Sequence, residues 1–119
     1  MSASSLPTPR PYKGFRVRMG VYAVRHVPSG RTLLGCSPHL VGALNRQRFQ
    51  LELGAHPVAA LQADWRRDGA GAFQFDIVDE LEPDPALSAT HDYRDDLAGL
   101  EALWRERLGL TPQTSYPPA

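Results

Sequence analysis

Three segments of the chain alternate hydrophobic and polar residues, which is the pattern of a half-buried β-strand. The first covers residues 18–26 (RMGVYAVRH), and a VPSG turn at 27–30 returns the chain into a second strand at 31–35. The third covers residues 73–78 (FQFDIV). Successive side chains on a strand point to opposite faces, so the first strand has an apolar pair on each face. One pair is Val21 and Ala23, and the other is Tyr22 and Val24.

Apolar residues recur at helical spacing in three further segments. Ser37 followed by Pro38 predicts the N-cap and first turn of a helix that ends at Gly54. Pro57 opens a second helix, which Gly69 closes. A last amphipathic helix follows a loop rich in Pro and Asp. Its apolar stripe is formed by Leu97, Leu100, Leu103, Trp104 and Leu108.

The predicted elements follow the order strand–strand–helix–helix–strand–helix. An antiparallel hairpin joined by one more strand predicts a small three-stranded sheet flanked by about three helices, an α+β (mixed α/β) fold. We expect residues 18–108 to form one domain, because a chain of 119 residues has the length of a single domain. Residues 1–17 and 109–119 are rich in Pro, Ser and Thr, and we expect both segments to be flexible tails.

The composition is typical of a soluble globular protein, with 42% hydrophobic and 22% charged residues. No apolar run approaches the roughly 18 residues of a membrane span, and the first residues lack the apolar region of a secretory signal. Cys36 is the only cysteine, so it cannot form an internal disulfide or a zinc site with four scattered histidines. We therefore expect a cytoplasmic protein that does not contact membranes, in which Cys36 packs as a small hydrophobe.

The net charge is zero, but the charges are unevenly distributed. Residues 1–67 carry ten basic and two acidic residues, whereas residues 68–119 carry three basic and eleven acidic residues. Twelve of the thirteen basic residues are arginine, whose planar guanidinium suits phosphate groups. Two interpretations remain open: the charges pair across the fold, or they form a dipolar surface with one face that attracts a polyanion.

Two tripeptides indicate a family. The pair GVY at 20–22 and LLG at 33–35 resembles the paired motif that names the GIY-YIG nuclease superfamily. Further segments occur where that family has related ones, and the resemblance extends over about residues 18–108. These segments are Asn45-Arg46, GAHP at 54–57, LQADW at 61–65 with Asp68-Gly69, FQFDIVDEL at 73–81, and Glu101 three residues before Trp104.

The resemblance implies metal-dependent cleavage of nucleic-acid phosphodiesters, with DNA as substrate in preference to RNA. It places Tyr22, Arg46, His56 and Glu101 in the catalytic site, with Glu101 as the ligand of a Mg²⁺ or Mn²⁺ ion. Basic side chains on the two middle helices would contact the nucleic acid. They are Arg46, Arg48, Arg66 and Arg67. The predicted domain holds no separate DNA-binding module, so we expect target specificity to come from a protein partner or to be slight.

The chain departs from the family pattern at three positions. Leu33 replaces the tyrosine of the second motif, Ala43 stands where the family has an arginine, and Gln47 where it has a histidine. Loss of a transition-state arginine lowers a rate by about 10³–10⁵. Arg46 lies three residues after Ala43 on the same helix face, and we expect it to supply the missing charge at reduced efficiency.

Alternatives without chemistry remain open for each residue. Tyr22 could be a packing residue with a bonded hydroxyl, Glu101 a solvated helix residue, and His56 a helix-capping or loop residue. The arginines could serve solubility alone. For the whole chain, the alternatives to a nuclease with weak or lost activity are an inactive nucleic-acid-binding module and a protein-interaction or regulatory domain.

Overall fold

The computed structural model describes residues 18–88 and 90–116. A three-stranded antiparallel sheet has the order β2-β1-β3, with β1 (Gly20–His26) between β2 (Thr32–Ser37) and β3 (Phe73–Glu80). The predicted α+β fold and its element order are confirmed. The predicted tail at 1–17 lies outside the described residues.

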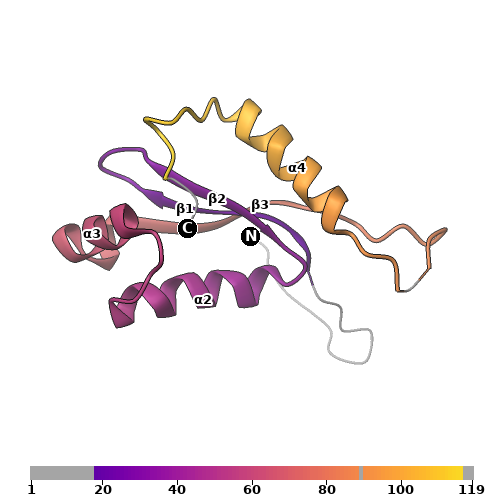
Figure 1. Cartoon of the computed structure of the whole chain (residues 1–119), viewed down its shortest axis with the longest axis horizontal. Helices are drawn as coiled ribbons and strands as arrows, with labels where there is room; N and C mark the ends of the chain where they lie inside the picture. The colour runs from indigo at the N-terminus through magenta and orange to yellow at the C-terminus, as the bar shows by residue number, and fades with distance from the viewer. Residues whose placement is uncertain (1–17, 89, 117–119) are drawn as a thin grey trace, which may run out of the picture.

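Helices cover both faces of the sheet (Figure 1). One face carries α2 (Leu40–Leu53) and α3 (Ala59–Asp68), and the other carries α4 (Arg94–Arg107). A short 3₁₀ turn, η1 (Ala70–Ala72), leads from α3 into β3. In the described part of the chain, no helix has the length and apolar character needed to cross a membrane.

The two faces of the sheet bury two hydrophobic clusters, as the alternation in β1 predicts. Val24 packs toward α2 and α3, whereas Val21 and Ala23 pack toward α4. The larger cluster joins the sheet to α2, the loop after it and α3. Its buried members are Val24, Leu51, Val58, Leu61, Phe73 and Tyr116. Burial of side chains of this size stabilises a fold by roughly 1.5–3 kcal/mol each.

The helix that follows β2 begins later than the sequence pattern predicts. Ser37 is the last residue of β2, where it pairs with Gly20, so the predicted N-cap at Ser37 is wrong. The Ser37 hydroxyl instead accepts a hydrogen bond from the backbone N–H of His39, the actual N-cap residue of α2. The other end of α2 agrees with the prediction, because Gly54 adopts the left-handed conformation with φ of 76°.

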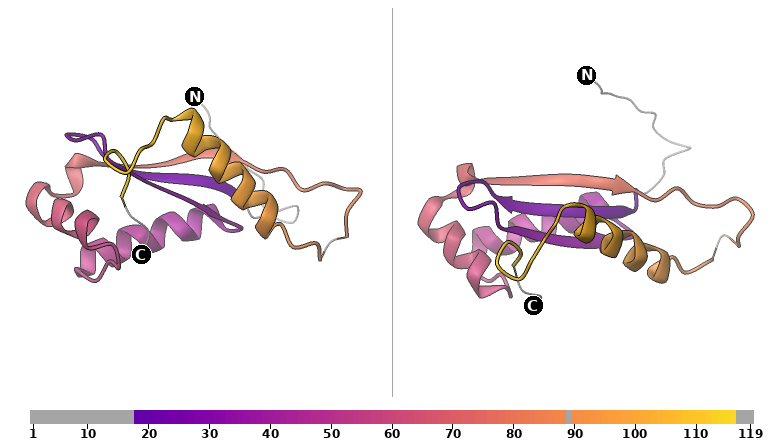
Figure 2. Two further views of the ribbon diagram at one scale, coloured as in Figure 1. Left: turned by 45° about the horizontal axis from the view of Figure 1, so that its top comes forward. Right: turned by 90° about the horizontal axis from the view of Figure 1, so that it is seen from above.

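Residues 109–116 pack on the sheet, in contrast to the flexible tail predicted over 109–119, of which 117–119 lie outside the described residues. Thr32 of β2 donates its N–H to Thr114 and accepts one from Tyr116, which makes a parallel bridge to edge strand β2. Tyr116 is buried in the larger cluster and its hydroxyl donates to Asp64 of α3. Figure 2 shows α4 and this segment over the β2 side of the sheet.

Candidate functional site

A cavity of about 300 Å³ opens between β1, the end of β2 and the first half of α2. Side chains from all three elements reach it. The lining residues are Tyr22, Cys36, Ser37, His39, Gly42, Ala43, Arg46 and Gln47. Two of the four predicted catalytic residues, Tyr22 and Arg46, therefore line one cavity.

Tyr22 is held on both sides. Its ring lies over Gly35 of the neighbouring strand, and its hydroxyl accepts a hydrogen bond of 3.3 Å from the amide nitrogen of Gln47. Burial raises the pKa of the Tyr22 phenol. The hydrogen bond from Gln47 and the charge of Arg46 act in the opposite direction, and the carboxylate of Glu101 acts with burial. The phenol therefore stays protonated at neutral pH.

His56 lies behind Gln47 and does not line the cavity. Its side chain is buried, and its Nε2 lies 2.5 Å from the Gln47 carbonyl oxygen. Its Nδ1 accepts a hydrogen bond from the backbone N–H of Val58. Burial lowers the pKa of His56, so the ring is neutral. His56 is therefore connected to the cavity through its hydrogen bond to Gln47, which in turn contacts Tyr22.

Gln62 fixes the loop that carries His56. The Gln62 side-chain oxygen accepts the backbone N–H of His56, and its amide group donates to the backbone carbonyl of Leu51 at the end of α2. Gln62 is itself buried. The LQADW and GAHP segments, which the sequence analysis singled out, thus form one polar network that ends at Tyr22.

Glu101 approaches from the opposite face of the sheet. It lies on α4, where Arg105 donates to it at 3.0 Å, and its side chain is 26% exposed. Burial, together with the interaction with the same carboxylate, raises the pKa of the Cys36 thiol of β2 to about 11. The charge of Glu101 also acts to raise the Tyr22 pKa, but Glu101 lines a different cavity from the one that Tyr22 and Arg46 share.

The residues present fit a divalent metal only in part. In the ranges that the structure describes, no cluster of three or more His, Cys, Asp or Glu side chains could hold a metal ion. Glu101 offers a single accessible carboxylate. A Mg²⁺ ion there would need water and phosphate oxygens of a bound substrate to complete its coordination.

Arg46 and Ala43 lie on the same side of α2, as the helical spacing predicts, and both line the cavity. Arg46 is exposed and close enough to Tyr22 to influence its pKa. The Arg46 guanidinium is therefore in a position to contact an anion in the cavity.

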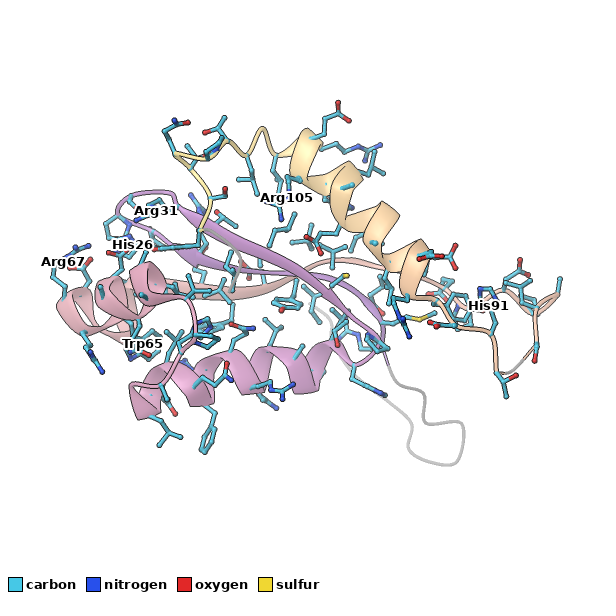
Figure 3. The ribbon with its side chains drawn as sticks, in the orientation of Figure 1. His26, Arg31, Trp65, Arg67, His91 and Arg105 are labelled. Carbon is cyan, nitrogen blue, oxygen red and sulfur yellow. The ribbon has the colours of Figure 1, made fainter. Side chains whose placement is uncertain are left out.

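The other predicted nucleic-acid contacts have partners away from the cavity. Arg48 stacks over Phe75, with the guanidinium 4.8 Å from the ring centre. Arg66 donates to the backbone carbonyl of Gly54. Arg67 pairs with Asp64 and Asp68 at the α3 end of the molecule, near His26 (Figure 3). The structure therefore does not gather these three arginines with Arg46 in one strip. The ion pairs of Arg67 are consistent with the interpretation that opposite charges pair within the fold.

Comparisons with known proteins give a match in structure alone. No family model and no curated protein matches this chain. The catalytic domain of the homing endonuclease I-TevI superposes with a TM-score of 0.66 and 21% sequence identity, over 85% of this chain and 98% of that domain. A mutant of the same domain also gives a TM-score of 0.66, with 18% identity over 87% of this chain and 95% of that domain. I-TevI is a GIY-YIG endonuclease. This chain has a GIY-YIG-like fold.

In the GIY-YIG-like fold the two tripeptides lie side by side on neighbouring strands. Tyr22 of the first and Gly35 of the second are partners across β1 and β2. Leu33 stands two residues before Gly35, packs against the larger cluster, and lines a second cavity of about 850 Å³ together with Glu101. An aliphatic side chain therefore occupies the position for which the family motif has a tyrosine hydroxyl.

Gln47 is the member of this hydrogen-bond network to which the sequence assigned no role. The resemblance marked it as a departure from the family pattern, and nothing in its local sequence indicates a role. In the structure it connects Tyr22 to His56 with hydrogen bonds at both ends of its amide. The contact joins residues far apart in sequence, so only the packing of α2 against β1 reveals it.

Proposed function

We propose that this protein binds nucleic acid, with DNA preferred over RNA, at the cavity beside α2 and hydrolyses its phosphodiester bonds weakly with Mg²⁺ or Mn²⁺. The observation that carries the proposal is that Tyr22 of β1 and Arg46 of α2 line one cavity, and that the charge of Glu101 on α4 reaches the Tyr22 phenol. The likeness to the catalytic domain of a homing endonuclease supports the same substrate class.

Each residue has a role that follows from its chemistry. The Arg46 guanidinium would bind the phosphate and stabilise the charge that develops on its oxygens. The Tyr22 hydroxyl would contact the phosphate from the floor of the cavity. Glu101 would hold the metal, which, when bound, stabilises the departing oxygen. In hydrolysis a water oxygen bonds to phosphorus, the bond to the departing oxygen breaks, and a phosphate monoester and a free hydroxyl result.

The replacements at Leu33 and Ala43 favour a second candidate, a nucleic-acid-binding module without activity. Ala43 lines the same cavity but provides no charge, and Leu33 provides no hydroxyl beside Glu101. Both candidates leave target choice to a protein partner, and both place the protein in the cytoplasm with its nucleic acid.

The deciding experiment is cleavage of plasmid DNA, single-stranded DNA and RNA with Mg²⁺ or Mn²⁺. Wild type is compared with Glu101→Gln and with Glu106→Gln, an exposed glutamate on the same helix that serves as control. Activity that requires metal and disappears only in Glu101→Gln supports the nuclease. Activity that is equal in all three proteins comes from a contaminant and contradicts it.

Binding separates the remaining candidates. An inactive module is expected to bind oligonucleotides with an affinity that falls log-linearly as salt rises, because each phosphate contact releases counterions. Arg46→Ala should weaken this binding and reduce the salt slope, whereas Arg94→Ala, at the exposed start of α4, should not. Absence of binding to DNA and RNA would instead favour the protein-interaction domain.

A further inference from the structure

The hydrogen bonds behind Tyr22 have a direction that is fixed from their buried end. The backbone N–H of Val58 can only donate, so the Nδ1 atom of His56 must accept and carries no proton. A neutral imidazole has one proton, which therefore resides on Nε2. The tautomer of His56 thus follows from a backbone contact of 3.0 Å.

The orientation of Gln47 follows from this tautomer. Since His56 Nε2 donates, the Gln47 atom that faces it must be the carbonyl oxygen. The amide nitrogen then faces Tyr22, at 3.3 Å from the phenolic oxygen, and an amide nitrogen can only donate. The Tyr22 oxygen is therefore an acceptor toward Gln47, and its own proton must point elsewhere.

The cavity is the direction open to that proton. One side of the Tyr22 ring is closed by Gly35, and Gln47 occupies the position on the α2 side. Tyr22 lines the cavity together with Arg46. We propose that Gln47 is a positioning residue that holds Tyr22 as a hydrogen-bond donor to a phosphate oxygen bound beside Arg46, so that Tyr22 binds the substrate and takes no proton from it. The identity of the ligand as a phosphate group rests on the proposed function.

The chemistry of the neighbouring groups agrees with this role. A primary amide does not accept a proton near neutral pH, so Gln47 cannot take the phenolic proton, as an imidazole at the same position could. The charged and titratable groups around the phenol are Arg46 of α2, Cys36 of β2 and Glu101 of α4. Together with burial, they leave the pKa of Tyr22 above its ordinary value.

Gln47→Glu tests the proposal with almost no change in shape. A carboxylate has only acceptors, so Glu at this position would accept from both His56 and Tyr22 and turn the phenolic proton away from the cavity. We expect the affinity for a short fluorescein-labelled DNA duplex to fall about 10- to 100-fold, as for loss of a hydrogen bond to a charged group. Tyr22→Phe should cause a similar loss.

Gln50→Glu is the matched control, because it adds the same charge to the same helix three residues later. It should weaken binding by less than about threefold. In the double variant of Tyr22→Phe and Gln47→Glu, the two losses should not add, since both remove one donated proton. Additive losses, or a Gln47→Glu effect no larger than that of Gln50→Glu, would overturn the proposal and leave the proposed function intact.

The tautomer of His56 provides a readout that does not depend on binding. Nitrogen-15 NMR of the imidazole at neutral pH should show the proton on Nε2 in wild type and in Tyr22→Phe. A proton on Nδ1 would mean that Nε2 accepts from Gln47, so that the Gln47 oxygen would face Tyr22 and accept its proton. That result would overturn the inference. A wild-type protein with the expected tautomer that binds no oligonucleotide would remove the proposed function, and with it the phosphate contact of Tyr22.

Discussion

The Tyr22 ring lies so close to Gly35 that a Cβ atom at position 35 would stand 2.6 Å from both the Cζ and the hydroxyl oxygen of the tyrosine. The two residues are direct partners across β1 and β2. Position 35 therefore requires glycine, because the Tyr22 ring leaves no room for a Cβ atom. The contact links the two tripeptides, because Tyr22, the last residue of GVY, packs against Gly35, the last residue of LLG.

Gly35→Ala is expected to displace the Tyr22 hydroxyl from Gln47 and from the cavity. The added methyl group meets the rigid ring, so the ring or edge strand β2 must move, and overpacking of this kind costs about 1–3 kcal/mol. We expect both lower stability in urea unfolding and loss of oligonucleotide binding. Gly99→Ala is the control, because nothing lies within 4 Å of a Cβ at that exposed helix position. Full binding by Gly35→Ala would contradict the role of this contact.

Ala43→Arg should raise metal-dependent DNA cleavage. The side chain at position 43 lines the cavity with Arg46 and Tyr22, and a guanidinium there would add a second charge stabiliser beside Arg46. Since one preorganised donor is worth about 10²–10³ in rate, we expect a gain of at least about tenfold in kcat. Ala102→Arg, which adds the same charge at an exposed position of α4, should leave the rate unchanged. A gain in both variants would indicate nonspecific attraction of DNA instead.

Stability is expected to fall as the pH drops below about 6.5, in part because of His56. Burial lowers the pKa of His56 in the folded protein from an ordinary value of 6.5. Below that pH the unfolded chain binds a proton that the folded protein does not, which favours unfolding. Urea unfolding between about pH 7.5 and about pH 5.5 measures the effect. His56→Asn should lower stability at both pH values but reduce the pH dependence, whereas His39→Asn, which removes an exposed histidine, should retain it.

Tyr116→Phe tests how firmly the C-terminal segment is attached. The Tyr116 hydroxyl donates to the buried Asp64 at 2.5 Å, and the variant keeps the ring but removes this donor. We expect a loss of about 1–3 kcal/mol in the free energy of unfolding, because a buried carboxylate loses a partner. Tyr93→Phe, which removes an exposed hydroxyl that accepts from Asp84, should cost less than about 0.5 kcal/mol. Equal losses of unfolding free energy in the two variants would show that the hydrogen bond from Tyr116 to Asp64 does not stabilise the fold.

The local pattern of the sequence was enough to predict the elements and their order. Alternation in 73–78 and in the first strand predicted β3 and β1, and glycine at positions 54 and 69 correctly marked the ends of α2 and α3. These features depend on neighbours along the chain, such as the two-residue period of a strand and the left-handed conformation available to glycine. The start of α2 was missed, because sheet pairing continues to Ser37 and overrides the local helix signal.

The candidate site was predicted in part. The family resemblance indicated Tyr22, Arg46 and Glu101; the structure places Tyr22 and Arg46 at one cavity and Glu101 at another. It gave no sign of Gln47 as the link to His56, nor of the partners that hold Arg48, Arg66 and Arg67. Each of these contacts joins side chains from separate elements, so it depends on how the helices pack on the sheet.

The sequence by itself determined which segments of this protein form strands and helices, since periodicity and turn residues act over a few neighbouring positions. The tertiary structure alone decided that the C-terminal segment bridges to Thr32 and buries Tyr116. A segment rich in Pro, Ser and Thr has no periodicity that would predict such a position. Its order comes from a parallel bridge, a buried ring and a hydrogen bond to Asp64, all provided by residues distant in the chain.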